Sequence, residues 1–140
     1  MIEREDLPDG LRLLRLARPE KRNALDRATA EALLAALAAA GDDPGVTAVI
    51  LAGSGPGFCA GADLTEVPFI TTFDQGYQVG KYGHTVMSRI RSLPFPTLAA
   101  INGAPLGGGL EIALYCRART VMRSVQAIGF PECFLGLIPG

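Results

Sequence analysis

Three consecutive glycines followed by a glutamate are the residues of this chain best suited to chemistry. The glycines, residues 107–109, stand between a short apolar run and an apolar segment that begins at Leu110. Amides at a helix start have no acceptor within the helix, and without side chains they can approach a polarised oxygen closely. Glu111 follows Gly108 by three residues, which places its carboxylate on the same face as that amide. The stretch predicts an oxyanion donor beside an acid or base, although a tight glycine-rich turn with a solvated glutamate fits it equally well.

The elements that must position this stretch alternate between strand and helix. β-Branched and leucine-rich runs predict strands, and apolar residues at helical spacing predict helices. The expected strands are residues 11–17, 46–52, 98–101 and 118–122. The expected helices begin after an N-cap at Asp26, at about Ala62, at Tyr77 and at Leu110. A strand, a helix and a second strand over residues 11–52 indicate a crossover with parallel pairing, so the fold class is α/β.

A second glycine-dense loop, GSGPGFCAGADLTE at residues 53–66, follows the predicted strand 46–52. Open α/β sheets bind ligands beyond the carboxyl ends of their strands, so this loop is a candidate for the same site. It lacks the dinucleotide fingerprint and the lysine of a phosphate-binding loop. It can offer a second backbone amide, near Ala62, to meet the one at Gly108.

Composition limits the classes of function. The chain has 140 residues, 49% hydrophobic content and a net charge of −1. These values predict one compact domain without a basic patch, and therefore neither disorder nor nucleic-acid binding. No apolar run is long enough to cross a membrane, so a cytoplasmic protein is expected. The three cysteines and single histidine lack metal-ligand spacing, which predicts reduced thiols and no metal site.

Four motifs together resemble the enoyl-CoA hydratase/isomerase family, also called the crotonase superfamily. They are RPEKRNAL (residues 18–25), GFCAGADL (57–64), AAINGAPLGGGLEIAL (99–114) and FPECFLGLIPG (130–140). The resemblance covers essentially the whole chain. It implies a crotonase-like (ClpP/crotonase) spiral of β-β-α units that binds acyl-coenzyme A thioesters. Because family members continue past the last motif, residues 1–140 are expected to be a single partial domain, truncated before the C-terminal helices.

The resemblance also implies roles for individual residues. The backbone N–H groups of Ala62 and Gly108 would form the oxyanion hole for the thioester carbonyl. Glu111 would activate a water molecule, and Glu132 would supply a proton to C2. The residues that would bind coenzyme A are Lys21, Arg22, Ala24, Ala60, Ala62, Asp63 and Leu64. No metal or redox cofactor is expected, and the protein would be a homo-oligomer, a trimer or hexamer.

The paired glutamates favour one reaction within this family. Two carboxyl groups suffice for syn addition of water across the C2=C3 bond of a 2-enoyl-CoA, as in fatty acid β-oxidation. Enoyl-CoA isomerisation, which can use a single carboxylate, and acyl-CoA hydrolysis remain alternatives. A catalytically inactive acyl-CoA-binding or subunit-interaction module is a further alternative, which the short chain favours.

Overall fold

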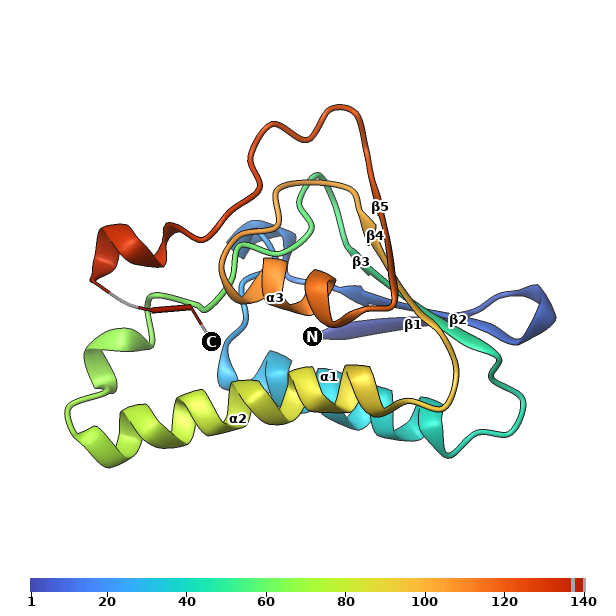
Figure 1. Cartoon of the computed structure of the whole chain (residues 1–140), viewed down its shortest axis with the longest axis horizontal. Helices are drawn as coiled ribbons and strands as arrows, with labels where there is room; N and C mark the ends of the chain where they lie inside the picture. Colours follow the sequence, from blue (N-terminus) through green and yellow to red (C-terminus); the bar gives the residue numbers. More distant parts are fainter. Residues whose placement is uncertain (137, 140) are drawn as a thin grey trace.

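The computed structural model describes residues 1–136, 138 and 139, which form one mixed β-sheet with three α-helices packed on one face (Figure 1). The strands are β1 (Ile2–Asp6), β2 (Leu11–Leu16), β3 (Ala48–Gly53), β4 (Thr97–Ile101) and β5 (Ala118–Val121). The α-helices are α1 (Arg27–Gly41), α2 (Phe73–Ser92) and α3 (Gly108–Tyr115). Short 3-10 helices lie at Pro8–Gly10, Pro19–Lys21, Val67–Phe69 and Pro131–Leu135. Leu137 and Gly140, which belong to the fourth motif, lie outside the described residues.

The strands follow one another across the sheet in chain order. β1 and β2 form an antiparallel pair, with Ile2 opposite Leu16. β2, β3, β4 and β5 are then parallel neighbours, so each of the last three strands is reached by a connection that carries α1, α2 or α3. The predicted crossover over residues 11–52 is confirmed. β1 was not predicted, because its sequence IERED carries charges on both faces of an edge strand.

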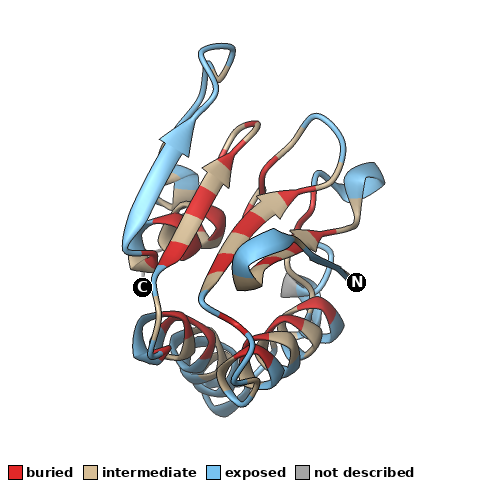
Figure 2. Ribbon diagram, turned by 90° about the vertical axis from the view of Figure 1, so that its right-hand side faces the viewer, coloured by how far each residue is buried: buried red, intermediate tan, exposed pale blue. Residues whose placement is uncertain are grey.

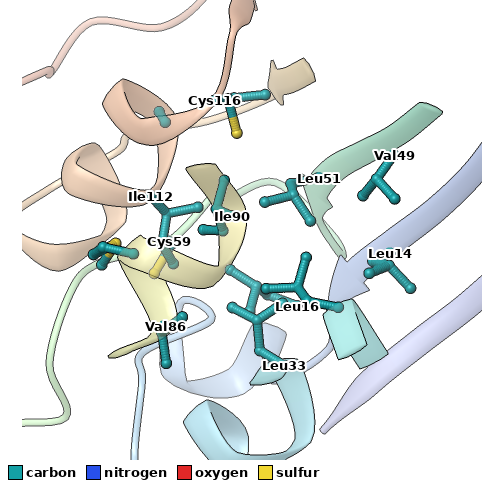
Figure 3. Close-up of a cluster of buried hydrophobic side chains, with 14 of the residues drawn as sticks. Leu14, Leu16, Leu33, Val49, Leu51, Cys59, Val86, Ile90, Ile112 and Cys116 are labelled. Carbon is teal, nitrogen blue, oxygen red and sulfur yellow. The ribbon is translucent and has the colours of Figure 1, made fainter. Parts of the chain in front are cut away.

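The hydrophobic core lies between one face of the sheet and the three helices. Along β2, β3 and β4 buried residues alternate with half-buried ones, so only one face points into the core (Figure 2). Leu14, Val49 and Leu51 of the sheet meet Leu33 of α1 and Ile90 of α2 there (Figure 3). The predicted strand over residues 46–52 is confirmed as β3, with one face in the core. The other face stays half-exposed.

Capping residues explain where α1 and α2 begin. The Asp26 carboxylate accepts a hydrogen bond of 2.7 Å from the Thr29 amide, which confirms the predicted N-cap of α1. α2 begins at Phe73, four residues before the predicted Tyr77. Thr72 and Gln75 form a reciprocal capping box that starts it there. As a result, the first turns of α2 carry largely exposed apolar side chains, among them Phe73, Tyr77 and Val79.

No helix begins at Ala62, and that prediction is wrong. Ala62 instead lies in an extended bridge, parallel to Leu25. The Leu25 amide donates to the Gly61 carbonyl at 2.8 Å, and the Asp63 amide donates to the Leu25 carbonyl at 2.9 Å. These tertiary hydrogen bonds hold the backbone extended, which the local sequence does not reveal.

The C-terminal end of α3 is closed by a side chain from β5. Nη1 of Arg119 donates to three carbonyl oxygens, those of Ala113 at 3.0 Å, Leu114 at 3.2 Å and Cys116 at 2.9 Å. The last carbonyls of a helix have no partner within it, and a cation at this end also complements the helix dipole. Arg119 thus ties the short helix α3 to the neighbouring strand.

We expect Arg119→Met to lower the free energy of unfolding by about 1–3 kcal/mol, because charge-assisted hydrogen bonds to the helix end are lost while the aliphatic stem is kept. Arg117→Met is the matched control, since the described residues offer no hydrogen-bond partner to the exposed Arg117 side chain. Urea unfolding of the three proteins measures the difference. Equal midpoints for Arg119→Met and the control would contradict this role.

Candidate active site

Four loops meet beyond the carboxyl ends of the parallel strands, and short bridges join them in order. Leu25 pairs with Ala62, Cys59 with Pro105, and Leu106 with Gly129. Each bridge is parallel, like the main sheet. Each β-α unit therefore supplies one strand to the sheet and one extended segment to this second ladder. The ladder brings the four sequence motifs, which are far apart in the chain, to one place.

The two predicted oxyanion donors lie on adjoining segments. A Cβ added at Gly61 would be 3.3 Å from the Gly108 nitrogen, and one added at Gly108 would be 3.9 Å from the Gly61 Cα. The Gly61–Ala62 peptide thus lies against the first residue of α3. Within the described residues neither the Ala62 nor the Gly108 amide has a backbone acceptor. Two neighbouring amides without partners can bind one polarised oxygen.

The two predicted catalytic glutamates are both placed by Gly107. This residue has a φ of 50°, which favours glycine, and it precedes α3. The Glu111 amide donates to the Gly107 carbonyl at 3.0 Å, and half-buried Glu111 lies in the first turn of α3. From the opposite direction the Glu132 side chain packs against Gly107, since an added Cβ would be 3.1 Å from its Cδ. A larger residue at 107 would displace that carboxyl group.

The segment that leads to Glu132 is held by the last bridge of the ladder, between Leu106 and Gly129. The Gly107 amide donates to the Gly129 carbonyl at 3.0 Å, which fixes the segment that leads into Pro131–Leu135. Oε2 of Glu132 is buried and has no hydrogen-bond partner among the described residues. A buried polar atom without a partner is costly, and such atoms are found where a ligand or a reaction requires them.

The predicted coenzyme A residues lie in the two segments joined by the first bridge of the ladder, between Leu25 and Ala62. Arg22 adopts a left-handed conformation with a φ of 52°, and its carbonyl accepts a hydrogen bond of 3.0 Å from the Ala60 amide. Lys21 and Arg22 are exposed, as are Ala62 and Leu64, whereas Ala24 is buried. The structure therefore brings all seven predicted residues together.

Asp63, by contrast, turns inward. Its carboxylate accepts hydrogen bonds from the Thr65 hydroxyl at 2.7 Å and the Thr65 amide at 3.1 Å, and it pairs with Arg18 at 3.1 Å. These bonds lower the pKa of Asp63 to about 2. Only 7% of the residue is exposed, so its side chain is committed to the protein rather than to a coenzyme.

Arg22 and Ala60 also line a hollow of about 310 Å³. Its other lining residues are Pro19, Pro56, Gly57, Ala104 and Leu106. The walls come from three of the four loops. The arginine is the ionic group among them, so the hollow suits a group with an apolar part and a negative charge at the mouth.

Two asparagines that organise these loops were missed by the sequence analysis. The buried Asn23 side chain accepts from the Arg18 amide at 2.9 Å and donates to the Ser54 and Gly57 carbonyls, each at 2.9 Å. The Asn102 side chain exchanges hydrogen bonds with both backbone groups of Gly53, at 3.1 and 2.8 Å. An asparagine before a small residue in a loop is the sequence signal that could have indicated them, because its side-chain amide can form the hydrogen bonds that backbone groups of the loop lack.

The two buried cysteines offer no nucleophile. Burial raises the pKa of Cys59 to about 12 and that of Cys116 to about 11, so both thiols stay protonated. Cys133 is exposed and unpaired with another cysteine. Across the part of the chain that the structure describes, no group of three potential ligands could hold a metal ion, and no helix is long and apolar enough to cross a bilayer.

Comparisons with known proteins agree with this architecture. The sequence pattern of the enoyl-CoA hydratase/isomerase family matches residues 6–140. An enoyl-CoA isomerase/hydratase of Mycosarcoma maydis is 41% identical over 139 residues, covering 94% of this chain and 50% of its own length. A crystal structure of an enoyl-CoA hydratase from Bacillus anthracis superposes with a TM-score of 0.93 at 34% identity, covering 99% of this chain and 54% of that one. The chain belongs to the enoyl-CoA hydratase/isomerase family.

A third relative is likewise matched over about half of its own length. A crotonyl-CoA hydratase of Syntrophomonas wolfei is 36% identical over 141 residues, covering 100% of this chain and 52% of its own. The chain thus spans about half the length of the relatives it matches. The expected α/β fold class of the crotonase type is confirmed by the sheet, the helices and the structural neighbours.

The glycines of the GGG motif differ in what a side chain would meet. A Cβ at Gly109 would lie 2.8 Å from the Cys59 carbonyl carbon, whereas one at Gly108 would have its nearest contact at 3.8 Å, with Leu25. We expect Gly109→Ala to lower the free energy of unfolding by about 1–3 kcal/mol, because backbone must move. Gly108→Ala, the matched control, should change it by less than about 1 kcal/mol. Urea unfolding measures both values, and equal losses would contradict the close approach at Cys59.

The low pKa of Asp63 predicts a pH dependence of stability. Its folded pKa of about 2 lies below the ordinary 3.8, so its contribution is complete above about pH 4 and is lost as the pH falls toward 2. We expect Asp63→Asn to be less stable at neutral pH and to lose less of its stability over that acid range. Urea unfolding at a series of pH values tests this. Parallel curves for the two proteins would be the contrary result.

Proposed function

We propose that this protein is an enoyl-CoA hydratase, which adds water in the syn sense across the C2=C3 bond of a 2-enoyl-CoA to give a 3-hydroxyacyl-CoA. The observation that carries the proposal is the pair of adjoining amides at Ala62 and Gly108, which lack acceptors within the described residues. Two of the relatives are named for hydration of enoyl-CoA or crotonyl-CoA, which supports it.

The chemistry explains why two amides are required. Attack of water at C3 pushes negative charge through the conjugated system onto the thioester oxygen. Fixed N–H donors stabilise that enolate more than the neutral carbonyl, so they lower the barrier instead of only binding substrate. Removing one such donor typically costs about 3–4 kcal/mol of barrier. Gly108 has no side chain and an added Cβ there would have its nearest contact only at 3.8 Å, so the oxygen can come close to that amide.

Two glutamates would transfer the protons of the reaction. Glu111 takes a proton from the attacking water, and Glu132 delivers one to C2 on the same side of the alkene. Both are set around Gly107, which supports their acting on one substrate. Since they share one water molecule, their protonation belongs to the pair. The reaction moves only protons and water, so the proposal includes no metal or redox cofactor.

Substrate binding and assembly complete the proposal. Lys21 and Arg22 are exposed cations, Arg22 lines the hollow, and both would attract the phosphates of coenzyme A. The backbone at Ala60, Ala62 and Leu64 would face the rest of the coenzyme. A homo-oligomer remains part of the proposal, since apolar side chains such as Phe134 are 89% exposed in the single chain.

Isomerisation of a 3-enoyl-CoA is the second candidate. The Mycosarcoma maydis relative is named for both reactions, and the same oxyanion hole would stabilise the dienolate formed when C2 loses a proton. Isomerisation can proceed with one carboxylate that moves the proton from C2 to C4. The two reactions therefore differ in their need for the second glutamate.

Purified protein expressed from its complete reading frame should convert a short 2-enoyl-CoA to the 3-hydroxyacyl-CoA. Loss of the conjugated thioester absorbance follows the reaction, and chromatography identifies the product. Turnover of a 3-enoyl-CoA alone would replace the hydratase proposal by the isomerase. Tight binding of the thioester without turnover of either substrate would indicate an inactive acyl-CoA-binding module.

We expect Glu111→Gln and Glu132→Gln each to lower kcat for hydration by at least ~10²-fold, the usual scale of a general acid or base. Glu31→Gln, an exposed change on α1, is the control and should keep wild-type turnover. Steady-state kinetics with proteins of matched circular dichroism measure the effect. A glutamine variant with near-normal turnover would remove that glutamate from the mechanism.

A further inference from the structure

Arg18 joins the first two loops of the site through one side chain. Its Nη1 donates to the Ala24 carbonyl at 2.9 Å and lies 3.1 Å from the Asp26 carboxylate, while its Nη2 lies 3.1 Å from Oδ2 of Asp63. The Arg18 side chain is 18% exposed and that of Asp63 is 7% exposed. A planar guanidinium with several donors suits such a set of acceptors, and a lysine ammonium does not reproduce it.

Asp63 is also held from its other side. Oδ1 accepts from the hydroxyl and amide of Thr65, while Oδ2 binds Arg18. The Asp63 amide donates to the Leu25 carbonyl at 2.9 Å. Backbone and side chain of Asp63 are therefore both fixed, and with them the orientation of the residue directly before it, Ala62.

The anchor points of Arg18 are themselves rigid. Asp26 is the N-cap of α1 and accepts from Thr29, and the Arg18 amide donates to the buried Asn23 side chain. The loop of residues 18–26 is thus tied to a helix start and to the core. Arg18 transmits that rigidity to residues 62–63 across a separation of 45 positions in the chain.

We propose that Arg18 is a positioning residue for the oxyanion hole, which acts through Asp63 to hold the Ala62 N–H toward the thioester carbonyl. This inference rests on the function proposed above. The guanidinium of Arg18 is occupied by Ala24, Asp26 and Asp63, so its role would be exerted through them. An oxyanion donor is effective because it is oriented before the reaction, so a donor that can turn away loses much of its effect.

The expected loss of kcat is smaller than the loss caused by removing a whole oxyanion donor, but it is measurable. Loss of one oxyanion donor typically lowers kcat by about 10²–10³-fold, and a loosened donor should cost about 10-fold or more. We expect Arg18→Met and Asp63→Asn each to lower kcat by that amount, with a smaller change in KM. Arg18→Lys should recover only part of the loss, because one ammonium cannot reach all the acceptors that the guanidinium binds.

The matched control is Arg27→Met. Arg27 also pairs with a carboxylate, Glu31, at 2.8 Å, but its side chain is 83% exposed and its partner lies one turn further along α1, not in the loop that carries Ala62. The Arg27→Met substitution removes an arginine and an ion pair of similar length without touching the connection to Ala62. This variant should keep the wild-type kcat, KM and spectrum.

The deciding measurement is the carbonyl stretching frequency of a bound acyl-CoA thioester, by infrared difference spectroscopy. Two oriented donors polarise the C=O bond and lower its frequency in the wild-type protein. Arg18→Met and Asp63→Asn should lose much of that shift, while a coenzyme A thioether without the carbonyl should bind all forms with equal affinity. Because Asp63→Asn keeps the shape of the side chain, it tests the connection even if Arg18→Met folds poorly.

Each outcome separates the two proposals. If wild type shows no lowered frequency, the oxyanion hole and with it the proposed function are wrong. If wild type shows the shift and a folded Arg18→Met or Asp63→Asn variant keeps it, the positioning role is wrong while the proposed function stands. Equal weakening of thioester and thioether binding would also overturn the inference, since Arg18 would then only shape the coenzyme cleft.

Discussion

The site depends on backbone that packs directly against backbone. Residues 57–61 run so close to residues 103–109 that no side chain fits at two of the glycines: a Cβ at Gly103 would lie 2.6 Å from Gly57 Cα, and one at Gly61 would lie 2.8 Å from the Leu106 carbonyl oxygen. This contact lets the bridge between Cys59 and Pro105 form, and it brings the peptides of Ala62 and Gly108 together. Glycine is required there by space, and at Gly61 and Gly107 also by φ.

Parallel strands explain why these loops can meet at all. Because β2, β3, β4 and β5 point the same way, their carboxyl ends lie at one edge of the sheet, and each following loop begins beside its neighbour. The bridges then add a second layer of pairing above that edge. Two asparagines satisfy the backbone groups that such irregular loops leave unpaired, buried Asn23 for Ser54 and Gly57, and half-buried Asn102 for Gly53.

Two arginines bind the segments that carry the proposed oxyanion donors. The Arg18 and Asp63 pair is largely buried and carries hydrogen bonds on both partners, a geometry that offsets the cost of taking ions from water. Exposed pairs such as Arg27 and Glu31 contribute little by comparison. Arg119 performs a similar task for α3, whose opposite end carries the amide of Gly108. Arg119 thus holds the far end of the helix that begins at Gly108, and Arg18 holds the loop that carries Ala62.

Much of this protein could be predicted from local pattern. β-Branched and leucine-rich runs indicated β2, β3, β4 and β5, and the Asp26 cap located α1, because these features act within a few residues. The glycine motif and Glu111 indicated a helix start with an acid or base. Tertiary structure alone decided that Ala62 lies in a bridge with Leu25, that Asp63 turns inward to Arg18, and that Glu132 packs against Gly107. Those contacts join residues that are far apart in the chain, and a hydrogen bond or close approach between distant segments leaves no periodic signal in either one.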